Sequence, residues 1–272
     1  MVERHGAGLF SVLLRHWRTR RGLSQLDLAL AADVSSRHVS FLETGRAKPS
    51  REMVLRLGAT LGVPLRDQNV MLGAAGFGAE FDQDGEGPGL PPAVEQAIGR
   101  MMRQQEPFPL VVMDRAYDVV RSNEGATRLL AAMVADPAAL APPVNAFRIV
   151  FDPRLCRPFI TDWERTARLL VSRLHREALE RPTDEGLAAL IGSLFEYPGV
   201  PRSFRQPDFS APSEPTLTVR MRRDDLELAF LTTLTVFNAP QSVALEDLRI
   251  ESYFPLDDAT ERACRALAAA AS

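Results

Sequence analysis

The chain has 272 residues, of which 46% are hydrophobic and 25% are charged, a composition typical of a globular protein with one or two domains. No apolar run reaches the roughly 20 residues that a membrane-spanning helix requires, and the N-terminus lacks the apolar segment of a signal peptide. The sequence therefore argues against a membrane protein and predicts a cytoplasmic location.

Charge is unevenly distributed behind a net charge of −3. Residues 1–80 hold 11 Lys and Arg against 7 Asp and Glu, whereas residues 81–272 hold 21 against 28. We expect the positive part to meet phosphate groups and the negative part not to do so. Cys156 and Cys264 lie far apart without a CxxC motif, and the four histidines show no ligand spacing, so buried thiols and no metal site are predicted.

Helical signals begin near the N-terminus. Apolar residues at helical spacing predict a first helix from about Leu9 to Arg20. Ser24 and Asp27 form a capping-box pattern that opens a second helix. Asp33 falls in the turn that follows, where a residue with positive φ is usually required and where Asp is better tolerated than most residues.

A third helix is expected after this turn, with Ser35 as its N-cap and with Val39 and Leu42 as its buried stripe. Gly45 fits the C′ position at its end. Ser50 is expected to cap a fourth helix, and a fifth helical piece follows. Two short helices around a tight turn, with polar residues massed at the start of the second helix, are typical of a helix-turn-helix that reads DNA.

The start of the third helix carries the side chains that would contact bases. The N-terminal turn of a recognition helix reaches base edges in the major groove, where Arg37 can donate two hydrogen bonds to guanine. Gln25 is placed to hold a phosphate, and Arg46 and Lys48 are expected to face the DNA backbone. The predicted DNA contacts are Gln25, Ser35, Ser36, Arg37, His38, Ser40, Arg46 and Lys48. The alternative is a helical scaffold with a solvated polar face.

Composition changes at residues 76–92, which are rich in Gly, Pro and acidic residues and are predicted to form a linker. Strand and helix patterns then follow one another. Strands are predicted at 110–113, 117–121, 217–222, 226–237 and 248–254. Helices are predicted at 92–106, 125–134, 162–180 and 183–195 and from 257 onward, and 147–151 is a short apolar segment.

The N-terminal motifs resemble a known family. The segment from Leu13 to Leu61 includes Leu23-Ser24-Gln25, Val34-Ser35, Phe41-Leu42-Glu43-Thr44-Gly45 and Lys48-Pro49-Ser50. It is similar to the Cro/C1 or XRE type of helix-turn-helix. The resemblance implies a fold of five helices and an ion pair between Arg18 and Glu43 inside the domain.

The C-terminal motifs resemble a narrower family. The sequences at 109–123, Asp162-Trp163-Glu164 and 249–255 are similar to the C-terminal domain of MmyB-like regulators. This resemblance implies a PAS-like domain, at least some members of which hold a fatty acid between sheet and helices. The expected organisation is an all-α five-helix head (1–75), a linker (76–92) and an α+β PAS-like domain (93–272) whose antiparallel sheet has helices on one face.

A ligand pocket is expected between the sheet and the helices of this domain. Alternate residues of the strand at 226–237 share one apolar face, and the helices offer further apolar side chains. Arg168, near Trp163, is the candidate anchor for a carboxylate. The predicted lining is Phe147, Phe151, Trp163, Arg168, Leu170, Phe195, Met221, Leu228, Phe230, Thr232, Leu234, Ile250 and Phe254. These residues also suit an ordinary core, and Arg168 also suits a solvated helix surface.

The leading interpretation is a transcription regulator that binds double-stranded operator DNA as a homodimer. Its C-terminal domain binds a small apolar ligand, with a fatty acid as one candidate, and the ligand alters operator binding. One alternative is a regulator whose C-terminal domain is a ligand-free dimerisation or protein-interaction module, with the helix at 92–105 as the dimer seam. Another is a flavin or haem PAS sensor. No GxSxG, Walker, HExxH or dinucleotide motif is present, so we predict no enzyme, no cofactor and no membrane partner.

Overall fold

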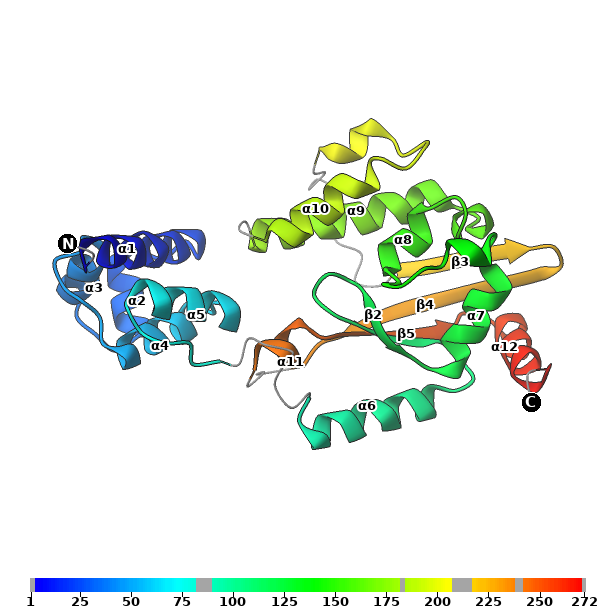
Figure 1. Cartoon of the computed structure of the whole chain (residues 1–272), viewed down its shortest axis with the longest axis horizontal. Coiled ribbons are helices and arrows are strands. Elements are labelled where there is room, and N and C mark those ends of the chain that lie inside the picture. Colours follow the sequence, from blue (N-terminus) through cyan, green and yellow to red (C-terminus); the bar gives the residue numbers. More distant parts are fainter. Residues whose placement is uncertain (1–2, 82–89, 182–183, 207–216, 238–241, 271–272) are drawn as a thin grey trace. The chain divides into compact units, whose positions relative to one another are not determined.

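The computed structural model describes residues 3–81, 90–181, 184–206, 217–237 and 242–270, which form two compact units (Figure 1). The N-terminal unit comprises Met1–Leu90 together with Phe237–Glu246. The sheet unit comprises Pro91–Val236 and Asp247–Ser272. Most of the predicted linker lies outside the described residues.

Five helices build the N-terminal unit, as the sequence predicts. They are α1 (Glu3–Arg20), α2 (Gln25–Ala31), α3 (Ser36–Glu43), α4 (Arg51–Thr60) and α5 (Leu65–Ala74). The first helix begins at Glu3, six residues before the predicted start. The earlier start was not predicted because the sequence before Leu9 carries no apolar stripe that marks it as helical.

Local capping chemistry sets the starts of three of these helices. The backbone amide of Asp27 donates a hydrogen bond to the hydroxyl of Ser24, and the backbone amide of Ser24 donates one to the side chain of Asp27. The predicted capping box is therefore confirmed. Ser35 and Ser50 cap α3 and α4 in the same way, each through a hydrogen bond from the amide three residues on. The turn between α2 and α3 places Asp33 at φ 54°, as predicted for this position.

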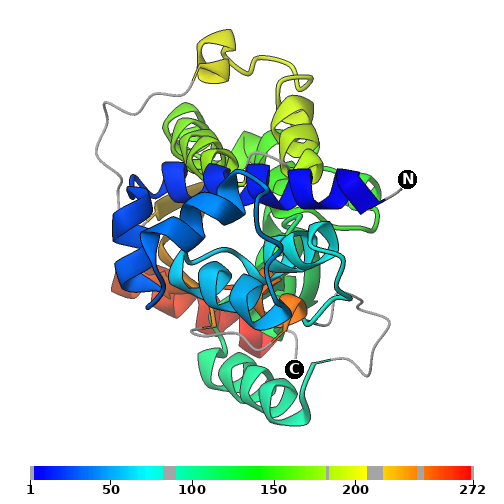
Figure 2. The same cartoon turned by 90° about the vertical axis from the view of Figure 1, so that its left-hand side faces the viewer.

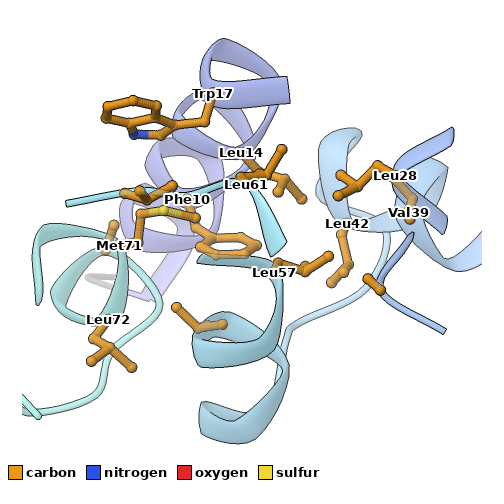
Figure 3. Close-up of a cluster of buried hydrophobic side chains, with 14 of the residues drawn as sticks. Phe10, Leu14, Trp17, Leu28, Val39, Leu42, Leu57, Leu61, Met71 and Leu72 are labelled. Atoms are coloured by element: carbon orange, nitrogen blue, oxygen red, sulfur yellow. The ribbon is translucent and has the colours of Figure 1, made fainter. Parts of the chain in front are cut away.

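The core of the N-terminal unit joins all five helices (Figure 3). Its fully buried members include Phe10, Leu14, Leu28, Val39, Leu42, Leu57, Met71 and Leu72. Burial of each such side chain stabilises the fold by about 1.5–3 kcal/mol. The outward side of α3 is therefore held rigidly by the packing of its inward side.

A five-stranded antiparallel sheet forms the centre of the second unit, in the order β2-β1-β5-β4-β3. The strands are β1 (Leu110–Met113), β2 (Val119–Ser122), β3 (Leu217–Arg223), β4 (Leu226–Thr235) and β5 (Arg249–Pro255). The predicted antiparallel sheet and its first hairpin are confirmed, and β4 and β5 pair at its centre.

The register of the strands decides which side chains share a face. Val111 pairs with Glu251 and Glu251 pairs with Leu234, so these three lie on one face, which we call the inner face. Thr232, opposite Tyr253, lies on the same face because it is two residues from Leu234. Neighbours along each strand point to the opposite face, which we call the outer face.

Further helices follow α5 along the chain, most of them in the sheet unit and one, Val243–Asp247, largely within the Phe237–Glu246 segment of the N-terminal unit. They are α6 (Pro92–Gln105), α7 (Glu124–Met133), α8 (Ala146–Phe151), α9 (Trp163–Glu180), α10 (Glu185–Leu194), α11 (Val243–Asp247) and α12 (Asp258–Ala270), with short 3-10 turns at Pro137–Ala139, Arg157–Phe159 and Arg202–Arg205. Two views place α8 and α9 on one side of the sheet and α6 on the other (Figures 1 and 2). The apolar segment at 147–151 is helical, as part of α8.

Candidate DNA-binding surface and ligand pocket

The exposed side of α3 presents a compact set of polar and basic side chains. Val39 and Leu42 are fully buried, whereas Ser36 and Arg37 near the N-terminus of the helix are exposed. The guanidinium of Arg37 lies 5.2 Å from the centre of the Phe41 ring, and that of Arg46 lies 5.9 Å from it. These cation–π contacts limit the freedom of both arginines while leaving their donors accessible.

An internal ion pair supports this surface. Arg18 donates to Glu43 at 2.6 and 3.0 Å, and the side chains are 13% and 3% exposed. Burial alone would raise the pKa of Glu43, but hydrogen bonds from Arg18 and Gln25, with the charges of Arg18 and Arg15, hold it below its usual value. The ion pair implied by the family resemblance is therefore present.

Gln25, a predicted DNA contact, also forms a hydrogen bond within the N-terminal unit. Its side-chain amide donates to Glu43 at 2.8 Å, so this amide is already engaged within the unit. The residue stays half-buried at the first turn of α2. Among the other predicted DNA contacts, Ser35, Ser36, Arg37, Arg46 and Lys48 are exposed, and His38 and Ser40 are half-buried. All are on α3 or near its ends, and their contacts with DNA stay a prediction.

A cavity of about 460 Å³ lies between the inner face of the sheet and helices α7, α8 and α9. Apolar side chains make most of its wall. Val111 and Val219 contribute from strands, and Leu130, Phe147 and Leu170 contribute from α7, α8 and α9. Volumes of about 300–1,000 Å³ are usual for sites that bind small molecules.

Three of the predicted lining residues, Phe147, Leu170 and Met221, line this cavity. Others pack around it without reaching its surface. Phe151, Trp163 and Phe195 belong to the hydrophobic cluster of the helices, Leu228 and Phe230 belong to the core beneath β3 and β4, Thr232 is buried, and Leu234 is exposed. The sequence pattern identified apolar residues near the cavity but did not separate those that line it from those that pack behind it or elsewhere.

Two strand residues were assigned to the wrong face. Ile250 lies between Arg249 and Glu251 and therefore points to the outer face, and Phe254 shares that side and is 41% exposed. The correction follows from the alternation of side chains along a strand, because Glu251 is the β5 residue opposite Val111.

Arg168 is also misplaced as an anchor. Its guanidinium donates to Glu164 at 3.2 Å, and its side chain is 58% exposed. It lies 5.4 Å from the centre of the Phe204 ring and is absent from the cavity lining. The arginine of α9 that does line the cavity is Arg173, five residues further along the helix.

Sequence reasoning missed the polar end of the cavity, which brings together Arg173, Glu251 and Tyr117. Arg173 donates to the hydroxyl of Tyr117 at 3.4 Å, and this hydroxyl donates to Glu177 at 2.5 Å. Glu177 also pairs with Arg249, which is 5% exposed. A charged network on α9 and β5 thus fixes Tyr117 at the cavity wall.

Burial perturbs the titration of residues in the cavity lining, including Glu251 and Cys156. Burial raises the pKa of Glu251, and the charge of Arg173 and a hydrogen bond with Thr232 oppose this shift without cancelling it. Burial alone raises the pKa of the Cys156 thiol to about 12, so this cysteine is uncharged at neutral pH. The prediction of buried cysteines is confirmed for both Cys156 and Cys264.

A helix-turn-helix unit joined to a sheet unit with an apolar cavity has the organisation of a transcription regulator with a ligand-binding domain. Residues 94–267 match the MmyB-like transcription regulator ligand binding domain, and residues 9–69 match a helix-turn-helix domain. The chain therefore belongs to the family defined by this MmyB-like ligand binding domain, and both resemblances seen in the sequence are confirmed.

Two individual proteins show partial likeness. Over 54 residues the chain is 43% identical to the HTH-type transcriptional regulator DdrOP3 of Deinococcus deserti, covering 20% of this chain and 42% of that protein. A solved structure of an RNA-binding Light-Oxygen-Voltage receptor aligns over 93% of this chain and 63% of that chain, at 15% identity. The TM-score of this alignment is 0.28.

None of the described helices is long and apolar enough to cross a bilayer. Within the same part of the chain, His, Cys, Asp and Glu side chains form no group of three suited to a metal ion.

Proposed function

We propose that the protein binds operator DNA as a homodimer through the exposed side of α3 and that a small apolar molecule in the cavity alters this binding. The cavity carries the proposal, because it gives the family's ligand-binding domain a place for a ligand. The binding of an apolar molecule there removes its surface and that of the wall from water, which favours binding by about 25 cal/mol per Å².

The DNA part of the proposal rests on α3. Its N-terminal turn is capped by Ser35 and exposes Ser36 and Arg37, the positions from which a recognition helix reaches base edges. Lys48, exposed after the helix, supplies charge for phosphate contact. A two-fold operator follows from the geometry of helix-turn-helix dimers, which place two recognition helices one turn of DNA apart.

The ligand-free alternative predicts a filled core and an unoccupied apolar stripe on α6. The cavity weighs against the filled core. Ile98, at the centre of the proposed dimer seam, is fully buried within its own chain. Val94, Met101 and Met102 on the same helix are half-buried as well. These observations favour a sensor domain over a pure dimerisation module.

Mass spectrometry of the purified full chain, native and then after solvent extraction, tests the ligand part. We expect a stoichiometric molecule with a long apolar chain, of the size of a fatty acid. Selection of operators from random duplex DNA tests the DNA part, and we expect an inverted repeat. Bare chain mass, together with failure of added lipids to bind, would contradict the ligand proposal, and absence of any selected sequence would contradict the DNA proposal.

A further inference from the structure

The polar end of the cavity holds opposite charges that already balance. Glu251 lines the cavity from β5 and Arg173 lines it from α9, and the charge of Arg173 acts on Glu251. Arg121 also belongs to the lining, but its guanidinium pairs with Glu95 at 2.6 Å. Among the described lining residues, Arg121 is thus paired with a carboxylate, and Arg173 shares the cavity wall with the carboxylate of Glu251.

An ionised ligand would disturb this balance. A carboxylate brought to Arg173 would place a second anion beside Glu251 in a wall that is mostly apolar. Charges transferred out of water without a partner carry a large desolvation cost, and like charges within a few ångströms repel.

The hydrogen-bonding groups at this end call for both a donor and an acceptor. The Tyr117 hydroxyl donates its hydrogen bond to Glu177, so towards the cavity it can only accept a hydrogen bond. The carboxylate of Glu251 accepts as well, whereas Arg173 can only donate. A ligand that satisfies all three needs at least one N–H or O–H group and one oxygen acceptor.

We propose that the cavity selects a long-chain molecule whose head is uncharged and both donates and accepts hydrogen bonds, such as a primary amide. The head donates to Glu251 and accepts from Arg173, and the chain lies along Val219, Leu130 and Phe147. This inference rests on the proposed ligand-binding function and narrows its ligand class. It makes Glu251 a specificity-determining residue that discriminates against the anions of fatty acids.

Calorimetric titration of the delipidated full chain with oleamide and with oleate, which share one chain, tests the inference at about pH 8, where a free carboxyl group is ionised. We expect oleamide to bind at least about tenfold more tightly, a difference of about 1.4 kcal/mol. Oleate binding that equals or exceeds oleamide binding would overturn the inference while supporting the ligand function. If neither molecule binds while operator binding persists, the ligand function itself fails and this inference fails with it.

A pair of variants assigns the selectivity to Glu251. Glu251→Gln removes the charge and keeps the shape, so oleate should bind about tenfold more tightly than to the wild type and the preference for oleamide should disappear. Glu227→Gln removes an exposed carboxylate of β4 that pairs with Arg222 at 3.5 Å, and it should leave both affinities unchanged. An unchanged preference in Glu251→Gln would overturn the role of this residue. The comparison of the two ligands on the wild type stands even if the variant does not fold.

Discussion

Arg37 is the side chain whose loss should change what the protein reads as well as how tightly it binds. Its guanidinium is exposed near the N-terminus of α3 and is oriented by the Phe41 ring. Arg37→Ala should lower the preference for the selected operator over one with an altered base pair by about 1–3 kcal/mol, because a bidentate contact with guanine is lost. Titration of both duplexes by fluorescence anisotropy measures this difference.

Lys48 provides the matched control for Arg37. It is exposed and is expected to contact phosphate, so Lys48→Ala should weaken binding to both duplexes equally and reduce the salt dependence by about one charge. If Arg37→Ala instead weakens both duplexes equally, Arg37 contacts only the DNA backbone and the assignment of base contacts to it is wrong.

The buried carboxylate of Glu43 makes the stability of the N-terminal unit dependent on pH. Its pKa is lowered in the folded state, so its contribution is complete above its pKa in the unfolded chain, about 4.3, and is lost as pH falls through the folded value. Glu43→Gln should lower the free energy of unfolding by about 3 kcal/mol at neutral pH, because Arg18 loses its buried partner. Between neutral and acidic pH, the free energy of unfolding of the variant should fall less than that of the wild type.

Urea unfolding followed by the emission of Trp17, in a Trp163→Phe background, isolates this unit because Trp17 lies in its core. Glu52→Gln is the control, since Glu52 is 81% exposed and pairs with Arg56 across one helical turn. Its effect should stay within about 0.5 kcal/mol. Equal effects of Glu43→Gln and Glu52→Gln would contradict the importance of the buried pair.

Single residues also show where prediction from sequence succeeds and where it stops. Caps such as Ser24 and Ser35 were predictable because capping is decided within four residues of sequence. The choice between Arg168 and Arg173 was not, because both lie on α9 beside apolar residues and a long arginine side chain can follow either side of the stripe. Only the three-dimensional position of the sheet separates them.

At the scale of elements, α7 depends on a close approach of backbone to backbone at Gly125. A Cβ atom there would lie 2.5 Å from the carbonyl oxygen of Pro107 and 2.7 Å from that of Phe108. Gly125→Ala should therefore displace α7, which lines the cavity, and lower the free energy of unfolding by about 3 kcal/mol, the upper end for overpacking. Hydrogen exchange of the amides of β1 and β5 measures the loss.

Gly192 in α10 is the opposite case. No atom lies within 4 Å of a Cβ placed there, and the residue is exposed within the helix. Gly192→Ala should stabilise the sheet unit by up to about 1 kcal/mol, because Ala is the better helix former. A destabilising Gly192→Ala, or a neutral Gly125→Ala, would contradict the packing described for these two helices.

Elements themselves were largely predictable, but their faces were not. Alternation along β4 placed Leu228 and Phe230 together correctly. The assignment of Ile250 to the face of Leu228 and Phe230 was wrong. Alternation within one strand shows which of its residues share a face, but it does not show how the strand is aligned with its neighbour, and a shift by one residue exchanges the two faces. For the same reason, Glu251 was not predicted to line the cavity. Its neighbours along β5, Ile250 and Ser252, are both buried on the outer face.

At the scale of the whole molecule, the chain joins its two units at more than one point. Phe237–Glu246, between the central strands β4 and β5, belongs to the N-terminal unit, where the amide of Leu65 donates to the carboxylate of Glu246 at 2.9 and 3.1 Å. Sequence reasoning expected one linker, at 76–92, because it reads a connection between strands as a local loop. The covalent path from β5 to the N-terminal unit is therefore only a few residues long.

Linkage between the cavity and the operator site must be reciprocal if the ligand regulates DNA binding. Any factor by which the ligand changes operator affinity must equal the factor by which operator DNA changes ligand affinity. We expect a factor of about 5–150, measured by titrating operator with and without saturating oleamide, and oleamide with and without saturating operator. Leu130→Trp, which fills the cavity from α7, should abolish both shifts and leave ligand-free operator binding intact. Oleamide binding with no change in operator affinity would mean that the cavity is not a regulatory site for DNA binding.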